Sequence, residues 1–381
     1  MSCRSAQFKA PLPLKYPIEP EVLKMKLHIV DTTLRDGEQT PGVAFDGDAK
    51  VEMAIALSDL GVDIIEVGIP AMGEEEIKAI KRVEELNLKA QLLTWNRLNI
   101  QDIEASLKTG VKNLHISIPS SSIQIEKKLR INHDELIVKT KEVIGYAVKK
   151  GCTVSVGAED ASRAEEEFLL KLFRTALEAG ATRIRYADTL GVLNPFSTLS
   201  IIKRIRDELD VDIDFHGHND FGLATANALA AFKAGAGYIS CCVNGLGERA
   251  GNTALEEIVM ALYYMDKCEI NIKPDKLVPV SKLVERHSQR IVSPGKPIVG
   301  RDVFTHESGI HVDGLLKDVR NYQHLDPLLL GRQNKFVLGK HSGRAAKKLL
   351  DVDGGDGIEK IPGDLYDNPY SSRVYRLQGF P

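Results

Sequence analysis

Two histidines, His216 and His218, lie two residues apart in the segment H-G-H-N-D. On an extended chain, residues two apart point to the same side, so both imidazoles could bind one divalent ion. An isolated pair of this kind is more often two hydrogen-bonded core histidines. Asp36, in the segment D-T-T-L-R-D-G-E-Q, would add a carboxylate. Two imidazoles and one carboxylate with open positions form a recurring catalytic metal site, which we predict here.

A glycine-rich segment, G-L-G-E-R-A-G-N, covers Gly245 to Asn252. Its glycines would let the backbone approach a ligand or the metal ion closely, and Asn252 could add a neutral oxygen ligand. A tight connection between a strand and a helix is the alternative interpretation, because spacing alone does not separate the two.

The elements that must position these residues are short β-branched runs alternating with amphipathic helical stretches. Helices are predicted at about 47–60 and 74–85. Glycines at the helix-to-strand turns predict left-handed helix caps. Eight βα units over roughly 240 residues match a (β/α)8 TIM barrel, and no Gly-x-Gly-x-x-Gly follows the first strand, which disfavours a dinucleotide fold. The predicted strands are 27–30, 63–68, 90–94, 113–118, 153–156, 183–187, 212–215 and 238–243.

Polar residues follow the predicted strands, and in a barrel the strand C-termini open onto one face, where these residues should converge. Such a cluster of charges needs a metal ion and an anionic ligand to compensate it. The converging residues are Arg35, Asp36, Glu66, Trp95 to Arg97, Ser117 to Ser120, Glu159, Asp160, Asp188, Thr189, His216 to Asp220 and Asn244 to Asn252.

The composition excludes several classes of protein. Fifty basic and fifty-three acidic residues give a net charge of -3, so no global attraction to nucleic acid or to an anionic membrane is expected. Five cysteines, widely spaced apart from the adjacent pair Cys241 and Cys242, are typical of reduced intracellular thiols. No uncharged run approaches the roughly 18 residues of a membrane helix, and residues 1–25 carry no apolar signal region. We expect a cytoplasmic protein with an extended, proline-rich N-terminal arm.

Together, the three motifs resemble the DRE-TIM metallolyase superfamily, in the Claisen-condensation branch that contains homocitrate, 2-isopropylmalate, citramalate and Re-type citrate synthases. The similarity runs from about residue 26 to 344. Within the branch, the stretches G-I-P-A-M-G-E-E-E, G-A-E-D-A-S-R, F-T-H-E-S-G-I-H-V-D-G and L-G-K-H-S-G are most similar to the homocitrate synthases of nitrogen-fixing bacteria. The resemblance implies an acyltransferase that condenses acetyl-CoA with 2-oxoglutarate and water to homocitrate and CoA.

The resemblance also implies roles for individual residues. It implies that Mg, Mn, Zn or Fe is bound by Asp36, His216 and His218, with Asn252 as a candidate fourth ligand. Arg35 would face the substrate carbonyl, where a fixed cation stabilises a developing oxyanion. Thr189 would bind the carboxylate of the 2-oxo acid, and Gln39 lies in the first motif. The catalytic set would be Glu159, His311 and Tyr322.

Substrate choice depends on a second cation for a dicarboxylate. Lysine-pathway homocitrate synthases carry an arginine four residues before the strand-5 glutamate, where this chain has Ser155. Arg97 and Arg185 are candidate replacements. For Arg185 an exposed strand-end arginine is the alternative. Oxaloacetate in a Re-type citrate synthase, 2-oxoisovalerate in an isopropylmalate synthase, and an inactive binding or scaffold paralogue remain open.

The expected domain organisation has four parts. Residues 1–25 form the arm, 26–272 the barrel, 273–350 a small helical lid subdomain, and 351–381 an irregular tail. A helix is predicted over 275–290, followed by a linker at 293–297. The resemblance implies a homodimer, because in relatives the lid can reach a partner subunit's active site.

Overall fold

The computed structural model describes residues 26–266, 268–337, 339–342, 358–360 and 375–377. The chain divides into two compact units, Met1–Ile272 and Lys273–Pro381, and each is described here by itself. The predicted arm at 1–25 lies outside the described residues.

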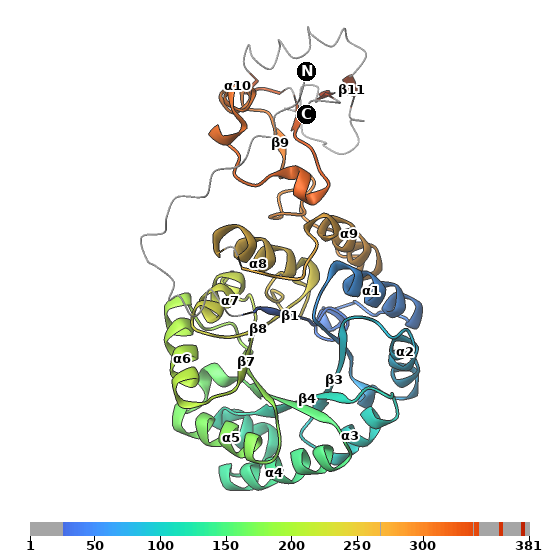
Figure 1. Ribbon diagram of the computed structural model, residues 1–381, viewed down its shortest axis with the longest axis vertical. Coiled ribbons are helices and arrows are strands. Elements are labelled where there is room, and N and C mark those ends of the chain that lie inside the picture. Colours follow the sequence, from blue (N-terminus) through green and yellow to red (C-terminus); the bar gives the residue numbers. More distant parts are fainter. Residues whose placement is uncertain (1–25, 267, 338, 343–357, 361–374, 378–381) are drawn as a thin grey trace. The chain divides into compact units, whose positions relative to one another are not determined.

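Eight parallel strands in the first unit close into a barrel, confirming the predicted fold (Figure 1). The barrel closes where β1 pairs in parallel with β8, with Val30 opposite Ser240. β5 continues three residues beyond its predicted end, since Gly157 and Ala158 still pair with β6. The strands are β1 (His28–Asp31), β2 (Ile64–Gly68), β3 (Gln91–Arg97), β4 (Asn113–Pro119), β5 (Thr153–Glu159), β6 (Arg183–Asp188), β7 (Asp212–Gly217) and β8 (Tyr238–Cys241).

A helix follows each strand, and the helices surround the ring of strands (Figure 1). Side-chain caps define several starts: Asp46 accepts from the backbone N–H of Ala49, and Asn132 forms a capping box with Glu135. The helices are α1 (Gly47–Leu60), α2 (Glu74–Glu84), α3 (Ile100–Leu107), α4 (His133–Lys149), α5 (Glu166–Glu178), α6 (Pro195–Glu208), α7 (Ala224–Lys233) and α8 (Leu255–Ala261).

A glycine in the left-handed conformation predicted from the sequence lies within three residues of the end of five of these helices. At Gly61 the requirement is double, because φ is +104° and a Cβ atom there would lie 2.3 Å from the carbonyl oxygen of Asn271. The five glycines are Gly61, Gly110, Gly151, Gly180 and Gly235.

Apolar side chains form two regions of the barrel core. Outward-facing residues of the strands, including Ile116 and Val154, pack under the helices. Inside the barrel, Val30, Ile64 and Leu93 form an apolar cluster near the N-terminal half of the strands. The inward-facing residues closer to the C-terminal ends of the strands are polar. These polar residues therefore lie next to packed apolar side chains inside the barrel.

The second unit begins with α9 (Leu277–Ser288), within the predicted helix at 275–290. It continues with α10 (Gly309–Lys317) and a parallel pair of short strands, β9 (Thr305–His306) and β10 (Lys335–Phe336). Within residues 351–381, where an irregular tail is expected from the sequence, β11 (Ile358–Lys360) and β12 (Tyr375–Leu377) form an antiparallel pair. The other residues of 351–381 lie outside the described part.

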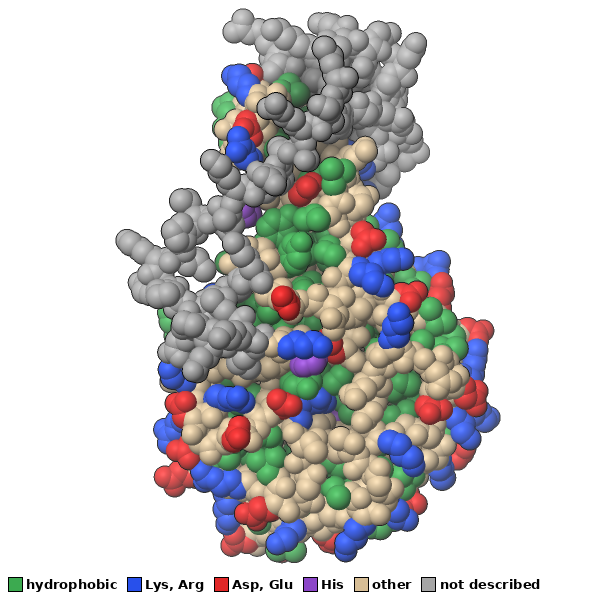
Figure 2. All heavy atoms as spheres, viewed as in Figure 1, with side chains coloured by type: hydrophobic (Ala, Val, Ile, Leu, Met, Phe, Trp, Pro, Cys, Tyr) green, Lys and Arg blue, Asp and Glu red, His purple; other side chains and the backbone are tan. Residues whose placement is uncertain are grey.

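The surface of the barrel carries both signs of charge. Figure 2 shows Lys and Arg side chains interspersed with Asp and Glu side chains, which agrees with the small net charge. Within the described ranges, every helix is too short or too polar to cross a bilayer.

Candidate metal centre and active site

Three side chains from two non-neighbouring strands meet at the C-terminal end of the barrel. Asp36 follows β1, His216 belongs to β7, and His218 follows β7. Asp36 Oδ2 lies 2.9 Å from His216 Nε2 and 3.9 Å from His218 Nε2, and the two Nε2 atoms are 3.3 Å apart. Ligands bound at right angles, each about 2.1 Å from an ion, lie about 3.0 Å apart. The structure therefore brings the predicted ligands together at spacings that suit one metal ion.

The protonation states of His218 and Asp36 also suit a cation. Burial, reinforced by nearby His216, lowers the pKa of His218 to about 3, so its imidazole is neutral. Burial alone would raise the pKa of Asp36, but Arg35 and the hydrogen bond from His216 hold it well below its usual range. A carboxylate facing two converging imidazole nitrogens is a typical donor set for zinc, iron or manganese.

Asn252 lies beside this cluster, because an isolated β-bridge joins its backbone to that of His218. Its Nδ2 donates to the carbonyl oxygen of Leu246 at 2.8 Å and contacts Cys242 Sγ at 3.3 Å. Its Oδ1 atom is buried without a hydrogen-bond partner. A free, buried amide oxygen is the group that a fourth ligand would need.

Arg35 is buried next to the metal cluster. Its Nη1 lies 3.3 Å from Asp36 Oδ2, and its Nε lies 3.3 Å from Glu66 Oε1. Its guanidinium carbon lies 5.6 Å from the centre of the Trp95 ring. These contacts fix the cation beside the candidate metal ligands.

A layer of buried ion pairs lies under Arg35. Glu66 is fully buried and also accepts from Arg185 Nη1 at 3.1 Å. Arg185 Nε in turn donates to Asp214 Oδ2 at 2.7 Å, and Asp214 accepts from Ser240. Burial alone would raise the pKa of Glu66, but the two arginines lower it. Glu66 thus connects Arg35, which lies beside the metal cluster, to Arg185 in the barrel interior.

The prediction for Arg185 needs correction. The alternative of an exposed strand-end arginine is wrong, because Arg185 is only 2% exposed. Its charge is already compensated by Glu66 and Asp214, so it is not a spare cation. Its Nη2 nevertheless has no hydrogen-bond partner, which leaves one buried donor available in the barrel.

Arg97 also has a protein partner. Its Nε and Nη2 both donate to the carboxylate of Asp102 at 2.9 Å, and its side chain is 64% exposed. The predicted role in binding a distal carboxylate would require breaking this bidentate pair, so Arg97 is the weaker of the two candidates.

Thr189 and Gln39 lie at the same end of the barrel. Thr189 follows β6, and its hydroxyl accepts from the backbone N–H of Asp160 at 2.8 Å. Gln39 lies in the exposed turn after β1. The loop 245–252 is tied to this rim by Arg249, which donates to Asp220 and, at 2.6 Å, to the carbonyl oxygen of Thr189.

The proposed catalytic set is divided between the two units. Glu159, at the end of β5, accepts from Lys128 at 2.6 Å and from Gln124 at 3.1 Å. In the second unit, the rings of His311 and Tyr322 stack with centroids 4.3 Å apart. The structure therefore brings His311 and Tyr322 together, and the role of all three residues stays a prediction.

Sequence reasoning missed His115, which points into the barrel beside Ser155. His115 Nδ1 lies 2.9 Å from Ser155 Oγ, and a Cβ atom at Gly157 would lie 2.5 Å from His115 Nε2. Burial lowers the pKa of His115 well below its usual value, so the ring is neutral. The period-two pattern of β4, with apolar Leu114 and Ile116 on the other face, is the signal that could have identified it.

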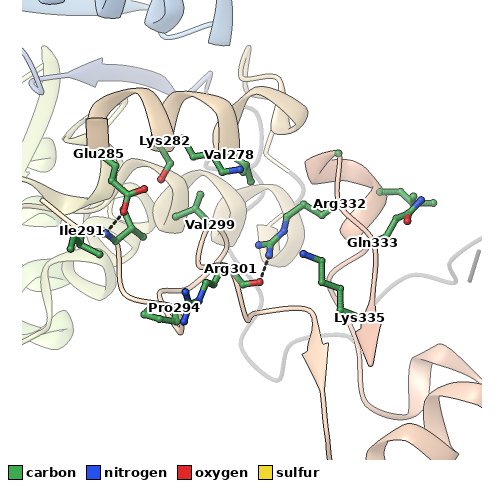
Figure 3. A pocket seen from close by; sticks show the side chains of 14 residues that line it. Val278, Lys282, Glu285, Ile291, Pro294, Val299, Arg301, Arg332, Gln333 and Lys335 are labelled. Carbon is green, nitrogen blue, oxygen red and sulfur yellow. Dashed lines mark hydrogen bonds between the residues drawn. The ribbon is translucent and has the colours of Figure 1, made fainter. Parts of the chain in front are cut away.

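The second unit contains a separate cavity of about 690 Å³ (Figure 3). Arg332 at its wall donates to the carbonyl oxygen of Arg301 at 2.7 Å, and Glu285 accepts from the N–H of Val292 at 2.6 Å. None of the predicted site residues lines this cavity. The metal cluster in the barrel is therefore the candidate active site.

The chain is similar to several known proteins. The HMGL-like family model matches residues 26–284, and the model described as homocitrate synthase post-HMGL domain-like matches residues 298–351. The chain is 48% identical over 320 residues to 2-isopropylmalate synthase 2 of Caldanaerobacter subterraneus subsp. tengcongensis, covering 84% of this chain and 83% of the relative. It is also 48% identical over 330 residues to homocitrate synthase 1 of Nostoc sp., covering 86% and 88%.

A solved structure supports the fold alone. The hydroxymethylglutaryl-CoA lyase from Pseudomonas aeruginosa superposes with a TM-score of 0.66 at 19% identity, covering 74% of this chain and 99% of that one.

Proposed function

This chain belongs to the HMGL-like family, and from that premise we propose that it condenses acetyl-CoA with a 2-oxo acid. The observation that carries the proposal is the cluster of Asp36, His216 and His218 with the guanidinium of Arg35 beside it. A non-enzymatic scaffold would have no need for two imidazoles, a carboxylate and a fixed cation converging in one buried site.

The proposed reaction divides between the metal centre and the fixed cation. A divalent ion held by Asp36, His216 and His218, with Asn252 as a fourth ligand, would act as a Lewis acid on the substrate ketone. Arg35 would stabilise the negative charge that develops on the ketone oxygen when the new carbon–carbon bond forms. Its contacts with Glu66 and Asp36 hold it in place before the reaction.

The remaining roles are assigned by the chemistry that each group can perform. We propose that His311 accepts a proton from the acetyl-CoA methyl group, with Tyr322 stacked on its ring and Glu159 completing the set. Thr189, and Gln39 in the first motif, would bind the carboxylate of the 2-oxo acid. Water then hydrolyses the thioester, which releases the hydroxy acid product and CoA.

Among 2-oxo acids we propose 2-oxoglutarate, giving homocitrate. The similarity to homocitrate synthase 1 of Nostoc sp. and the match of residues 298–351 support this choice. The unpartnered Nη2 of Arg185 adds to it, since a distal carboxylate could accept from this donor. An aliphatic substrate would leave the donor unsatisfied, at about 1–3 kcal/mol.

The similarity to 2-isopropylmalate synthase 2 favours 2-oxoisovalerate as the second candidate, because its identity and coverage are comparable. Its aliphatic end would need an apolar surface, whereas Arg185, His115 and Ser155 present polar groups to the barrel interior.

A thiol-release assay tests both the proposed reaction and the proposed choice of 2-oxo acid. The full chain is treated with a chelator, reconstituted with Mg²⁺, Mn²⁺, Zn²⁺ or Fe²⁺, and given acetyl-CoA with 2-oxoglutarate, oxaloacetate, pyruvate or 2-oxoisovalerate. We expect thiol release only with metal, and fastest with 2-oxoglutarate. Fastest turnover with 2-oxoisovalerate would overturn the dicarboxylate assignment. Absence of release with every 2-oxo acid would favour the scaffold interpretation.

We also propose a homodimer. The molar mass of the purified full chain, measured by light scattering, tests this, and a monomer that turns over at full rate would contradict it.

A further inference from the structure

We infer that Cys242 is a positioning residue of the metal centre: its thiol holds the Asn252 side-chain amide so that Oδ1, not Nδ2, is available as a ligand. This inference rests on the proposed function, because Asn252 is a ligand only if the site binds a metal ion. Nothing in the reaction itself requires the thiol to touch substrate.

The contacts of the Asn252 amide fix which end is free. Nδ2 has two hydrogens and two acceptors, the carbonyl oxygen of Leu246 at 2.8 Å and the sulfur of Cys242 at 3.3 Å. Oδ1 has no partner, although Asn252 is only 2% exposed. An unsatisfied buried oxygen costs about 1–3 kcal/mol, which binding of a cation would recover.

The thiol is itself oriented by a neighbour. Cys242 Sγ lies 3.0 Å from Thr32 Oγ1, and Thr32 Oγ1 lies 3.3 Å from the carbonyl oxygen of Cys241. The hydroxyl can donate to that carbonyl and accept from the S–H, which leaves the sulfur lone pairs for Asn252. In this series of hydrogen bonds, Asn252 Nδ2 donates to the sulfur, the S–H donates to Thr32 Oγ1, and the Thr32 hydroxyl donates to the carbonyl oxygen of Cys241.

The glycine-rich loop restrains the amide from another direction. A Cβ atom at Gly247 would lie 2.2 Å from Asn252 Nδ2, so only glycine lets the loop pass this closely. A flipped amide would place Oδ1 against the carbonyl oxygen of Leu246, where two acceptors repel each other. The carbonyl oxygen of Leu246 therefore disfavours the flipped amide. Cys242 Sγ accepts the second N–H of Asn252 Nδ2, and this second contact fixes the plane of the amide.

Cys241 provides a matched control. It is a buried thiol directly before Cys242, and both are 0% exposed. Because side chains alternate along an extended segment, Cys241 points to the opposite face, and in the parallel register it lies opposite Asp31. Truncating either thiol removes the same atoms, but only Cys242 contacts Asn252.

The experiment measures metal affinity without turnover. Full-length wild type, Cys242→Ala, Cys242→Ser and Cys241→Ala are stripped with a chelator and titrated with Mn²⁺, and free Mn²⁺ is followed by electron paramagnetic resonance. Changes in groups that orient metal ligands typically cost about 10–100-fold in affinity. We expect that loss for Cys242→Ala, a loss within about threefold for Cys242→Ser, whose hydroxyl can accept from Nδ2, and no change for Cys241→Ala.

Equal Mn²⁺ affinity of Cys242→Ala and wild type would overturn the inference, as would equal losses in Cys242→Ala and Cys241→Ala. Asn252→Asp provides a second test, because a carboxylate has no N–H for the thiol to orient. In that background Cys242→Ala should cause no further loss of affinity, and a full additional loss would contradict the inference. Thermal melting of each variant separates misfolding from loss of metal.

Failure of the proposed function gives a different result. If wild type binds Mn²⁺ but releases no thiol from acetyl-CoA, the reaction assignment fails while the Cys242 comparison still stands. If wild type and Asn252→Ala bind Mn²⁺ equally, Asn252 is not a ligand and the positioning role falls with it.

Discussion

Oδ2 of Asp36 lies 2.9 Å from Nε2 of His216, although the two residues follow or belong to strands that are not neighbours in the barrel. Their contact depends on closure of the sheet between β1 and β8, which brings the first and seventh βα units to one rim. Variants of Asp36 and Arg35 test this contact and the neighbouring contact between Arg35 and Asp36.

Asp36→Ala should abolish metal binding and turnover, because one of three converging ligands is lost. Arg35→Ala should retain the metal ion but lower kcat by about 10²–10³-fold, since the fixed cation is lost from the oxyanion position. Metal content after gel filtration and the rate of thiol release measure the two effects. Retained activity in both variants would place the active site elsewhere.

Gly247→Ala should weaken metal binding by at least about tenfold. The new Cβ would lie 2.2 Å from Asn252 Nδ2 and would displace the amide. Gly73→Ala is the control, because Gly73 also has positive φ, +124°, but a Cβ there meets no atom within 4 Å. Calorimetric titration with Mn²⁺ makes the comparison, and equal affinities of the two variants would show that the close approach at Gly247 is unimportant.

Arg185→Met should lower the free energy of unfolding by about 3–5 kcal/mol, because it removes the partner of two buried carboxylates, Glu66 and Asp214. Arg97→Ala, which breaks the pair with Asp102 at a 64% exposed guanidinium, should cost about 0–1 kcal/mol. Urea denaturation of both variants gives the comparison. Similar costs would mean that burial does not distinguish the two pairs.

The stability of the barrel should depend on pH through Asp31. Burial raises the pKa of this carboxyl from 3.8 to about 7, because neighbouring Thr33 stabilises the carboxylate only in part. Between these values the folded chain keeps a proton that the unfolded chain releases, so this contribution to stability falls as pH rises from about 4 to 7. The total loss is on the order of 4 kcal/mol.

Asp31→Asn removes this titration. The difference in unfolding free energy between the variant and wild type should therefore shift in favour of the variant between pH 5 and pH 8. Urea unfolding at several pH values measures that difference, and a difference that is constant with pH would contradict the raised pKa.

Much of the fold could be predicted because its signals are local. Apolar strand runs, helical periodicity and glycine caps such as Gly61 each depend on a few consecutive residues, and they defined the eight βα units. The motifs with Asp36 and His216 follow strands, so a parallel barrel placed them at one rim. The ends of strands were less predictable, as β5 shows, because backbone pairing continued through Gly157 and Ala158.

The sequence by itself determined which side chains reach the mouth of the barrel, since the alternation along a strand is a local property. Only the tertiary structure decided which of their charges are already compensated. Arg185 pairs in register with Asp214 on the neighbouring strand, but it reaches Glu66 on β2 only because the barrel closes, whereas Arg97 finds Asp102 in its own βα unit. Partners across the barrel depend on that closure, and no spacing within one strand reveals it.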